Sequence, residues 1–423
     1  MRDQKPKRIL FVSPYYPVDV SKSIHGAFQR MRMWLDAIQS VGAELDILLY
    51  PRAGAVAGPE AESATAQELS KLWGIRSNVV LCEREPQSHR DGLLASYIDA
   101  YVRPALGLWR QAEFSPYRGK RQREALAQCL ARSPDIVFFH RLHAAIPAAS
   151  LSIGSARIFV DLDDVEHRKF IRELARPPRW PRWRLKPLLY LQLLPLWWGE
   201  RAAIIRSDRA FVCSETDRQY LQRTMRVRNV EVIPNAVRWI NDVPLTTGLN
   251  VLFIGTYGYG PNNVAAEYLI QEVWPHLAKM CPKARLLIAG PGHEAIPSYR
   301  NSPVGVEFLG FVSDLDALYR RTRVVCCPIQ TGGGTRIKIL EAASYGIPVV
   351  SSPLGAEGID LMPDTEIVLR NSATDLAKAC AELLSDHSRA HRIGAAARER
   401  VRVLYTHDAI IPRIKAILTG DSS

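Results

Sequence analysis

The 423-residue sequence predicts an α/β protein made of two doubly wound domains. Short, almost continuously apolar runs alternate with helical segments along the chain, and such runs form parallel strands covered by helices on both faces. The chain is also too long for one ordinary hydrophobic core. The pattern is interrupted between Ile233 and Leu249 by prolines, threonines and a glycine. We therefore expect two α/β domains joined near the middle.

The strands follow from the apolar runs. In the first half we expect five strands: Arg8–Ser13, Glu44–Tyr50, Asp135–Phe139, Arg157–Val160 and Ala210–Cys213. In the second half we expect Asn250–Ile254, Ala284–Ala289, Val306–Leu309, Val324–Cys327 and Pro348–Ser351. Between the second and third strands expected in the first half, the small residues of Ala53–Ala66 predict a loop.

The domain boundaries follow from the same pattern. We expect a first Rossmann-like domain over residues 1–240, a second over 249–400, and a C-terminal helix over 401–423 that crosses back to the first domain. Ligands of doubly wound sheets bind at the carboxyl ends of the strands. The sequence therefore predicts a binding cleft between the two domains.

The composition is that of a folded protein without a membrane span. Apolar residues make up 47% of the chain and charged residues 23%. No window holds the roughly 18 uninterrupted apolar residues of a spanning helix. The run Ile9–Ser13 is too short for a signal peptide. The seven cysteines form no Cys-x-x-Cys pair, so we expect free thiols, no structural metal and a cytoplasmic location.

The net charge of +12 suggests an anionic partner, and part of it is concentrated in one segment. Eight basic residues and one acid lie between Arg168 and Lys186, with Trp180 and Trp183 among them. An apolar stretch that ends at Trp198 follows. Basic residues beside aromatics suit an anionic membrane surface, through 176–198, better than nucleic acid. Packing within the domain, with solvated arginines, is an equally open explanation.

One glycine-rich stretch predicts a phosphate site. Thr331-Gly-Gly-Gly-Thr335 leads into an expected helix with Arg336 and Lys338 in its first turn and Glu341 soon after. Cations at a helix N-terminus are unfavourable by about 0.3–1 kcal/mol each, and a bound anion would reverse that sign. Glycines let a backbone approach a ligand closely, and free amides at a helix start bind phosphate.

A second polar pattern follows an expected strand. Asp161, Asp163 and Asp164 resemble the nucleophile loop of haloacid-dehalogenase-type phosphatases, but that fold carries the motif on its first strand. We expect the acids to line the cleft, bind an acceptor or orient Arg and His groups. A helix N-cap role for Asp163 or Asp164 is the alternative. A dinucleotide-binding fingerprint does not fit, because the glycines between Gly255 and Gly260 lack its spacing.

The second half resembles a known family. The pieces that carry the resemblance are Phe253-Ile-Gly-Thr256 with Pro261-Asn-Asn263, Ala284–Gly290, Val306–Val312, Pro328, Ile339–Ala343 and Gly346–Val350. The first half adds Ser13–Pro17 with Gly26, Asp135–His140, Ser214-Glu215 and Pro234–Val237. Together they are similar to the GT-B glycosyltransferases, and among them to the retaining family 4, in a Gly-Gly-Gly-Thr-Arg-Ile-Lys variant. The resemblance is strong over residues 250–358 and diffuse before them.

The resemblance implies a hexosyltransferase that moves a sugar from a nucleotide-diphosphate sugar, most typically of UDP or GDP, to a glycan or lipid-linked acceptor. The anomeric configuration is retained and no metal or other cofactor takes part. In polysaccharide biosynthesis such an enzyme works in the cytoplasm or on the inner face of the membrane.

The resemblance also assigns roles to residues. Lys338 and Arg336 neutralise the leaving diphosphate, Glu341 holds the ribose, and His140 contacts the donor sugar. The other donor-binding positions are Gly333, Gly334, Thr335, Gly255 and Val312, and the acceptor or cleft positions are Gly26, Asp161, Asp163 and Asp164.

The sequence departs from the family pattern at two points. Gly333 stands where the family has the first of two glutamates spaced eight residues apart, and no cation follows Gly255. These departures keep a second hypothesis open. In it the chain is a catalytically inactive GT-B-fold protein that binds at the membrane surface.

Overall fold

The computed structural model describes residues 6–17, 26–55, 58–86, 98, 102–175, 186–241, 248–301 and 303–420. They form two compact units, which are described separately. The first unit contains residues up to Ile233 together with Ile411 onward, and the second contains Pro234–Ile410.

The first unit is built on a parallel sheet of seven strands in the order β3-β2-β1-β4-β5-β6-β7. The strands are β1 (Arg8–Ser13), β2 (Glu44–Leu49), β3 (Asn78–Leu81), β4 (Ile136–His140), β5 (Arg157–Asp163), β6 (Arg209–Val212) and β7 (Val230–Val232). The order turns back between β1 and β4. The carboxyl ends of these two strands therefore flank the crevice where doubly wound sheets bind ligands.

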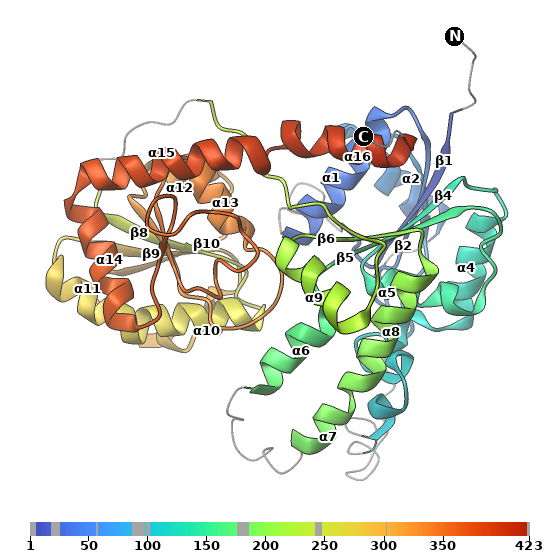
Figure 1. Ribbon diagram of the computed structural model, residues 1–423, viewed down its shortest axis with the longest axis horizontal. Helices are drawn as coiled ribbons and strands as arrows, with labels where there is room; N and C mark the ends of the chain where they lie inside the picture. Colours follow the sequence, from blue (N-terminus) through green and yellow to red (C-terminus); the bar gives the residue numbers. More distant parts are fainter. Residues whose placement is uncertain are drawn as a thin grey trace. The chain divides into compact units, whose positions relative to one another are not determined.

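Helices cover both faces of this sheet (Figure 1). They are α1 (Gly26–Ser40), α2 (Pro59–Glu68), α4 (Lys120–Leu130), α5 (Leu142–Ala145), α6 (Glu166–Ala175), α7 (Lys186–Leu191), α8 (Leu193–Arg206) and α9 (Glu215–Met225). Side chains alternate between the faces of a strand. Phe138 packs on Trp34 of α1, with ring centroids 4.6 Å apart, whereas the next residue, Phe139, belongs to the apolar cluster that includes Leu142 of α5.

The second unit repeats the design with six parallel strands in the order β10-β9-β8-β11-β12-β13. They are β8 (Asn250–Ile254), β9 (Arg285–Ala289), β10 (Val306–Gly310), β11 (Val324–Cys327), β12 (Val349–Ser351) and β13 (Val368–Leu369). Its helices are α10 (Gly260–Tyr268), α11 (Trp274–Met280), α12 (Leu315–Arg320), α13 (Ile337–Ser344), α14 (Ala373–Ser385) and α15 (His387–Leu404). Figure 1 shows α10 and α11 on one side of this sheet and α13 and α15 on the other. The predicted fold of two doubly wound parallel sheets is confirmed.

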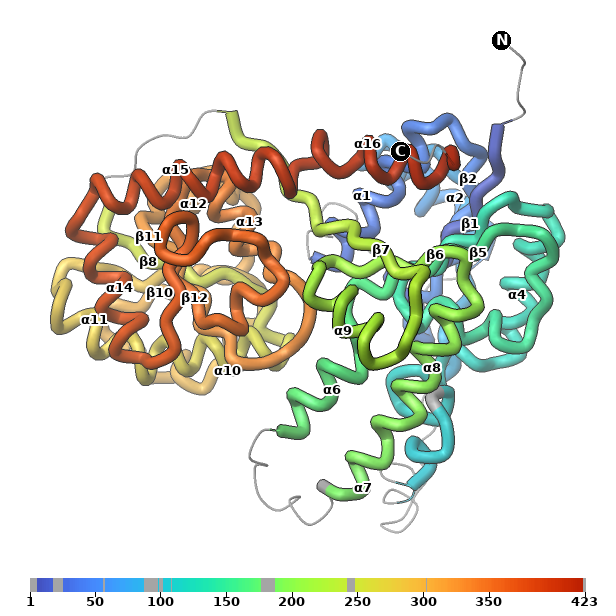
Figure 2. Tube along the Cα trace, viewed as in Figure 1, coloured from blue at the N-terminus to red at the C-terminus, as the bar shows by residue number. Residues whose placement is uncertain are grey.

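The last helix, α16 (His407–Thr419), begins in the second unit and ends in the first. In Figure 2 the C-terminal end of the trace lies beside the N-terminal segment of the first unit. The Lys7 ammonium donates to the carbonyls of Leu418 and Thr419, each at 2.9 Å. Arg413 donates to the carbonyl of Val232 at 2.9 Å. These bonds tie the chain end to the residue before β1 and to β7.

Some local expectations were wrong. Much of the expected loop at Ala53–Ala66 is helix α2, which begins with Pro59 and carries Glu60 and Glu62 in its first turn, both favourable there. The expectation followed the small residues and overlooked this start signal. Three short strands were missed, β3, β7 and β13.

The basic aromatic segment is only partly within the described residues. Positions 176–185, which hold four of its arginines and both of its tryptophans, lie outside them. The apolar part after them forms α7 and α8, and Pro187 and Pro195 fall in the first turns of these helices, where proline is tolerated. Among the described residues no helix is both long and apolar enough to span a membrane.

Candidate functional site

The glycine-rich loop lies at the point in the second sheet where the strand order turns back. Strand β11 pairs with β8 on one side and β12 on the other. The segment from Pro328 to Arg336 leaves the carboxyl end of β11 and leads directly into α13. This is the position in which doubly wound sheets bind ligands, and here it opens onto a helix N-terminus.

Arg336 holds the loop instead of standing in the first turn of the helix. It occupies the N-cap position of α13. Its guanidinium donates to the carbonyl oxygens of Gly333, of Gly334 at 2.6 Å and of Thr331 at 3.3 Å. The side chain is 8% exposed. The expectation of two open cations in the first turn is therefore wrong, because one of them is used to fold the loop back on itself.

This folding turns amide groups outward. In a planar peptide the N–H points opposite to the C=O, so the amides of Gly334 and Thr335 face away from the guanidinium that binds their partner carbonyls. Gly334 has φ of 69°, and Gly332 has φ of 96°, values that favour glycine. The described residues offer no backbone acceptor to the amides of Gly333, Gly334 or Thr335. They form, with the helix start, a concave row of donors suited to an anion.

Lys338 supplies the cation next to this row. Its ammonium donates to Oδ1 of Asn262 at 2.9 Å and lies 4.3 Å from the centre of the Phe253 ring. No carboxylate of the described residues forms an ion pair with it. Burial lowers the pKa of Lys338 to about 8, with the nearby Arg336 charge adding to the effect and the charge of Glu341 opposing it. A charge that is costly to keep in this position is one that a bound anion would stabilise.

Gly255 makes room for that lysine at the end of β8. A Cβ at this position would lie 2.8 Å from Nδ2 of Asn262 and 3.0 Å from Nζ of Lys338. Gly290, at the end of β9, is packed as tightly, because a Cβ there would lie 1.8 Å from the carbonyl oxygen of Gly255. The absence of a cation after Gly255 is thus matched by a lysine that reaches the same strand end from α13.

Glu341 follows Lys338 by three residues, so the two side chains share a face of α13. The Tyr319 hydroxyl donates to Oε2 of Glu341 at 3.5 Å. Tyr319 also stacks on Tyr345, with ring centroids 4.5 Å apart, which fixes the wall behind the carboxylate. Val312 lies two residues beyond β10, half-buried against the core, next to Phe311, which is 44% exposed.

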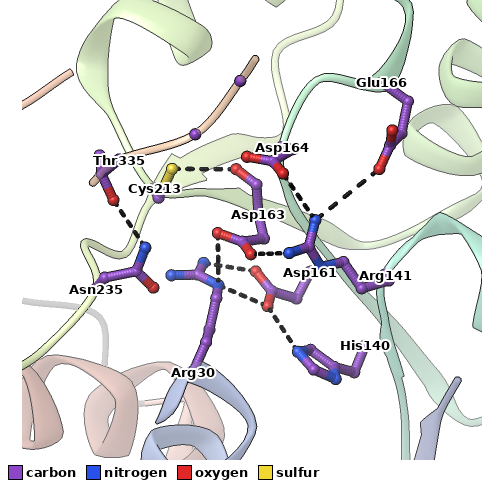
Figure 3. A network of polar contacts seen from close by, with 12 residues as sticks. Arg30, His140, Arg141, Asp161, Asp163, Asp164, Glu166, Cys213, Asn235 and Thr335 are labelled. Carbon is purple, nitrogen blue, oxygen red and sulfur yellow. Dashed lines mark hydrogen bonds and ion pairs between the residues drawn. The ribbon is translucent and has the colours of Figure 1, made fainter. Parts of the chain in front are cut away.

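Thr335 is held from a segment that the sequence analysis did not connect with the loop. Nδ2 of Asn235 donates to the Thr335 hydroxyl at 2.7 Å (Figure 3). Asn235 is itself 4% exposed and belongs to the same unit as the loop. This bond joins residues one hundred positions apart.

The corresponding position in the first unit, where β1 and β4 end, carries His140. Its side chain is fully buried. Nδ1 shares a hydrogen bond with Oγ of Ser13 at 3.0 Å, and among the described residues Nε2 has no hydrogen-bond partner. Burial, reinforced by the charges of Arg141 and Arg30, lowers the pKa of His140 well below its usual value. The imidazole is therefore neutral at pH 7.

The acidic residues beside it are paired with arginines (Figure 3). Arg30, fully enclosed on α1, binds Asp161 in a bidentate manner at 2.6 and 2.8 Å and lies 3.6 Å from Asp163. Trp34 adds a third donor to Asp161 at 3.1 Å. The ladder between β5 and β6 is irregular between Asp161 and Asp163, and Asp163 has φ of 57°. Such irregularities re-aim side chains at strand ends.

Arg141 completes this polar network from the other side. It contacts Asp163, Asp164 at 3.1 Å and Glu166 at 3.9 Å. Arg141 adopts φ of 75°, and its amide donates to the carbonyl of Asp161 at 2.7 Å. Burial raises the pKa of Asp163 to about 6, against the opposing effect of the two arginines. The acids thus orient Arg30 and Arg141.

This pairing excludes two readings of the acidic motif. Helix α6 begins at Glu166, and its first amides bind the buried Glu200 carboxylate, at 2.6 Å for Glu166 and 3.2 Å for His167. Neither Asp163 nor Asp164 caps it. The motif lies on the fifth strand, with Asp161 and Asp163 bound to arginines, so it does not match a phosphatase nucleophile loop.

Gly26 is the exposed first residue of α1.

Sequence reasoning missed four polar residues of the two sites, Arg30, Arg141, Asn235 and Asn262. Two signals were available. Arg141 follows His140 at a strand end, and Asn262 lies within the Pro-Asn-Asn stretch already singled out. Arg30 has no local signal, because an arginine inside a helix pattern normally indicates the exposed face.

Solved structures share this architecture over the whole chain. Sucrose-phosphate synthase from Thermosynechococcus elongatus aligns with a TM-score of 0.70 and 15% identity over 98% of this chain and 100% of that one. S. aureus TarM aligns with a TM-score of 0.71 and 12% identity, covering both chains completely. Anabaena HepE, solved in complex with UDP-glucose, aligns with a TM-score of 0.64 and 14% identity over 98% of this chain and 100% of that one. The chain has the GT-B fold of glycosyltransferases.

A family model matches this GT-B chain within its second unit, and two relatives match it over part of its length. Residues 248–386 match the family model of "Glycosyl transferases group 1". An uncharacterized 44.6 kDa protein in the cps region of Klebsiella pneumoniae is 28% identical over 138 residues, 30% of this chain and 35% of that protein. A GDP-mannose-dependent α-(1-6)-phosphatidylinositol monomannoside mannosyltransferase of Mycobacterium tuberculosis is 32% identical over 128 residues, which are 28% of this chain and 33% of that protein. Each match spans about a third of the relative's length.

Proposed function

We propose that this GT-B chain is a glycosyltransferase that moves a sugar from a nucleotide-diphosphate sugar to a glycan or lipid-linked acceptor. The observation that carries the proposal is Lys338, an ammonium held beside outward-facing loop amides without a carboxylate partner among the described residues. The match of residues 248–386 to group 1 glycosyl transferases supports the same conclusion.

The donor site uses three kinds of contact. Lys338 and the amides of Gly333, Gly334 and Thr335 bind the diphosphate, which becomes more negative as the sugar departs. Donors already in place where charge develops are the most effective form of electrostatic stabilisation. Glu341 accepts the two ribose hydroxyls in charge-assisted hydrogen bonds. Val312 and Phe311 contact the base.

Arg336 acts on the diphosphate through the loop. Because its guanidinium binds the carbonyls of the loop, it fixes the direction of the amides instead of touching the phosphate. Gly255 leaves the space that Lys338 needs. We therefore regard Arg336, Gly255, Asn235 and Asn262 as positioning residues of the donor site.

The reaction we propose is a hexosyl transfer with retention and with no metal ion. Lys338 and the loop amides supply the positive charge that a metal would otherwise bring to the diphosphate. His140, neutral and buried, is assigned a positioning role toward the donor sugar. The acceptor positions are Gly26 and the network of Asp161, Asp163 and Asp164 with Arg30 and Arg141.

We propose that the nucleotide of the donor is UDP or GDP. The UDP-glucose complex of Anabaena HepE, with the same fold, supports the first. The GDP-mannose-dependent relative of M. tuberculosis, matched over 28% of this chain, supports the second. We place the enzyme in the cytoplasm, peripheral on the inner face of the membrane, where polysaccharide biosynthesis supplies lipid-linked acceptors.

The alternative is a catalytically inactive GT-B-fold protein that binds at the membrane surface. One observation favours it. Gly333 stands where the resemblance places a glutamate against the donor sugar, and the sugar has no such carboxylate in this loop.

The experiment is a thermal-shift screen of the full chain with UDP, GDP, ADP and dTDP, followed by their sugars. A ligand at a hundred times its dissociation constant stabilises the fold by about 2.7 kcal/mol, which is readily measured. We expect one nucleotide to raise the melting temperature. Given the corresponding nucleotide sugar and no acceptor, the protein should slowly transfer the sugar to water and release the nucleoside diphosphate.

Glu341→Gln should reduce the shift, and Glu272→Gln, on the exposed surface of the same unit, should not. Stabilisation without any release of nucleotide from the matching sugar would favour the inactive binding protein. No stabilisation by any nucleotide diphosphate would disprove the donor site.

A further inference from the structure

The first unit contains an apolar cavity that the proposed donor site does not use. It has a volume of about 530 Å³, within the range of small-molecule sites. Phe139, Ile158 and Val160 of strands β4 and β5 line it on the side of the sheet. The opposite side is formed by α8, and the ends by α5 with the turn after it and by the turns between Arg103 and Arg110. Figure 2 shows that segment before α4 beside α8.

The cavity exists because facing residues are small. Eight of the residues that line it are alanine or glycine. On α8 they are Gly199, Ala202 and Ala203, and across from them stand Ala145, Ala148 and Ala149. Large side chains at these positions would have closed the space and extended the core. An apolar hollow of this size that is open to solvent has the usual form of a small-molecule site.

Large apolar side chains surround the opening without being buried. Leu106 and Leu194 are each 62% exposed, Trp198 is 53% exposed and Trp109 is 43% exposed, and all four line the cavity. Exposed apolar residues gathered at one opening mark a binding surface, whereas single ones are ordinary. Gly107 lets the indole of Trp109 lie directly on the backbone, 3.0 Å from where a Cβ would stand.

The charge in the lining of the cavity is positive. Of the described residues that line the cavity, Arg206 alone is charged. Arg201, on the same helix, lies over the Trp198 ring, 5.8 Å from its centre. The acid of this helix, Glu200, is fully buried against α6. An apolar interior with an arginine in its lining matches an amphiphile that has a hydrocarbon chain and an anionic head group.

We propose that this cavity binds the hydrocarbon chain of a lipid-linked, phosphate-bearing acceptor. The identification of the lipid as the acceptor rests on the proposed function, whereas the binding of an anionic amphiphile does not. The chain lies between β4, β5 and α8, and the phosphate lies at the rim near Arg206.

The position of the cavity connects it with the polar network. Phe139 and Leu142 line the cavity, and the two residues between them, His140 and Arg141, belong to the network at the end of β4. Arg206 lies three residues before β6, at the opposite, amino edge of the same parallel sheet. The cavity therefore extends between the two edges, with the arginine at one edge and the polar network next to the other.

The test uses 12-bromododecyl phosphate below its micelle-forming concentration, with the full chain and no nucleotide. Bromine quenches indole fluorescence at short range. We expect saturable quenching, and Trp198→Phe should reduce it because that indole, like that of Trp109, lines the cavity. The aromatic replacement keeps the apolar surface, so loss of quenching reports on the location of the bromine.

A filled cavity provides the decisive comparison. Ala203→Phe places a ring inside the cavity, and Ile205→Phe places the same ring on the exposed face of the same helix. Each methylene moved from water into an apolar site strengthens binding about fourfold. Displacing two or more should therefore weaken the affinity of Ala203→Phe for the probe by more than about tenfold. Ile205→Phe should bind as the wild type does.

The head group is tested separately. Arg206→Gln should weaken binding of the phosphate probe about two- to fivefold, as expected for an exposed charge, and should leave binding of a brominated dodecyl maltoside unchanged. Equal quenching of wild type, Ala203→Phe and Ile205→Phe would overturn the proposal. So would quenching that rises with probe concentration without saturating.

A second measurement separates this proposal from the proposed function. Transfer to an acceptor with a dodecyl chain should fall in Ala203→Phe, through a higher KM, whereas transfer to the same acceptor without the chain should be unchanged. Saturable probe binding in a protein that transfers no sugar would support the cavity and refute the enzyme. Sugar transfer that does not depend on the hydrocarbon chain of the acceptor would support the enzyme and refute acceptor binding in the cavity.

Discussion

The two sheets of this protein have the same order at their turning points but opposite electrostatics there. In the first unit, Arg30 and Arg141 are each bound to carboxylates of the protein, within 2.6–3.9 Å. In the second unit, Lys338 is bound to an amide oxygen, and the loop presents amides without backbone acceptors. The comparison indicates that the first is organised before a ligand arrives, whereas the second is completed by an anion.

The largest effect should come from breaking the arginine–carboxylate network of the first unit. Arg30→Met leaves Asp161 buried without its bidentate partner, and removing one member of a buried ion pair costs about 3–5 kcal/mol of unfolding free energy. Arg32→Met, on the exposed side of the same helix, should change stability by less than about 1 kcal/mol. Urea unfolding of the two variants measures this. Equal stabilities would contradict a network organised by Arg30.

Lys338→Met should have the reverse character. It removes the cation that stabilises the leaving diphosphate, so we expect sugar transfer to fall about 10²- to 10³-fold, as for other single electrostatic contacts to a developing charge. The unfolding free energy should not fall, because a charge that is costly to bury disappears. Lys378→Met, on the exposed face of α14, is the control. A variant that loses stability together with activity would place Lys338 in a structural role.

The pH dependence should separate the two sites further. Burial lowers the pKa of Lys338 to about 8 in the free protein, and a bound diphosphate raises it, so binding takes up a proton above that pH. The affinity for the nucleotide should fall by up to about tenfold per pH unit above pH 8. Stability has the opposite sign. Since the folded pKa is below the unfolded one, the unfolded chain holds more protons between about pH 8 and 10, and this contribution to stability rises with pH there.

Calorimetric titration of the nucleotide at pH 7, 8 and 9 measures the affinity trend. In Lys338→Met the slope above pH 8 should disappear. The same slope in wild type and variant would assign the proton to another group.

Gly255→Ala tests whether the lysine needs the space at the end of β8. The new Cβ would lie within 3.0 Å of Asn262 and Lys338 and would displace the ammonium, so nucleotide affinity should fall about tenfold. Gly258→Ala adds the same methyl group three residues later, where nothing lies within 4 Å, and should leave affinity unchanged. Isothermal titration of both variants measures it, and equal affinities would remove Gly255 from the site.

The smallest effect should come from Thr335→Val. It removes the hydrogen bond from Asn235, worth about 0.5–1.5 kcal/mol, and loosens the loop without removing an amide or a charge. Nucleotide affinity should fall about two- to tenfold. Thr365→Val, in an exposed turn, should have no effect. A drop as large as that of Lys338→Met would mean that the threonine hydroxyl itself contacts the ligand.

Much of the fold could be predicted because its signals are local. Parallel strands buried on both faces are read directly from apolar runs, and the expected ranges of β1, β8 and β11 coincide with the observed ones. Lys338 and Glu341 share a helix face by spacing alone. The same locality explains the errors. The two residues of β13 give too short a pattern, and the start of α2 was hidden among small residues.

By itself, the sequence determined two doubly wound sheets, a glycine-led helix start at the second turning point, and the residue types on which the proposed diphosphate and ribose contacts rest. Only the tertiary structure decided which polar groups face one another. Arg30 meets Asp161 across 131 positions, Asn235 meets Thr335 across 100, and Arg336 turns onto the loop carbonyls instead of the ligand side. Such pairs depend on strand order and on how each helix lies on its sheet. No local periodicity in the chain records them.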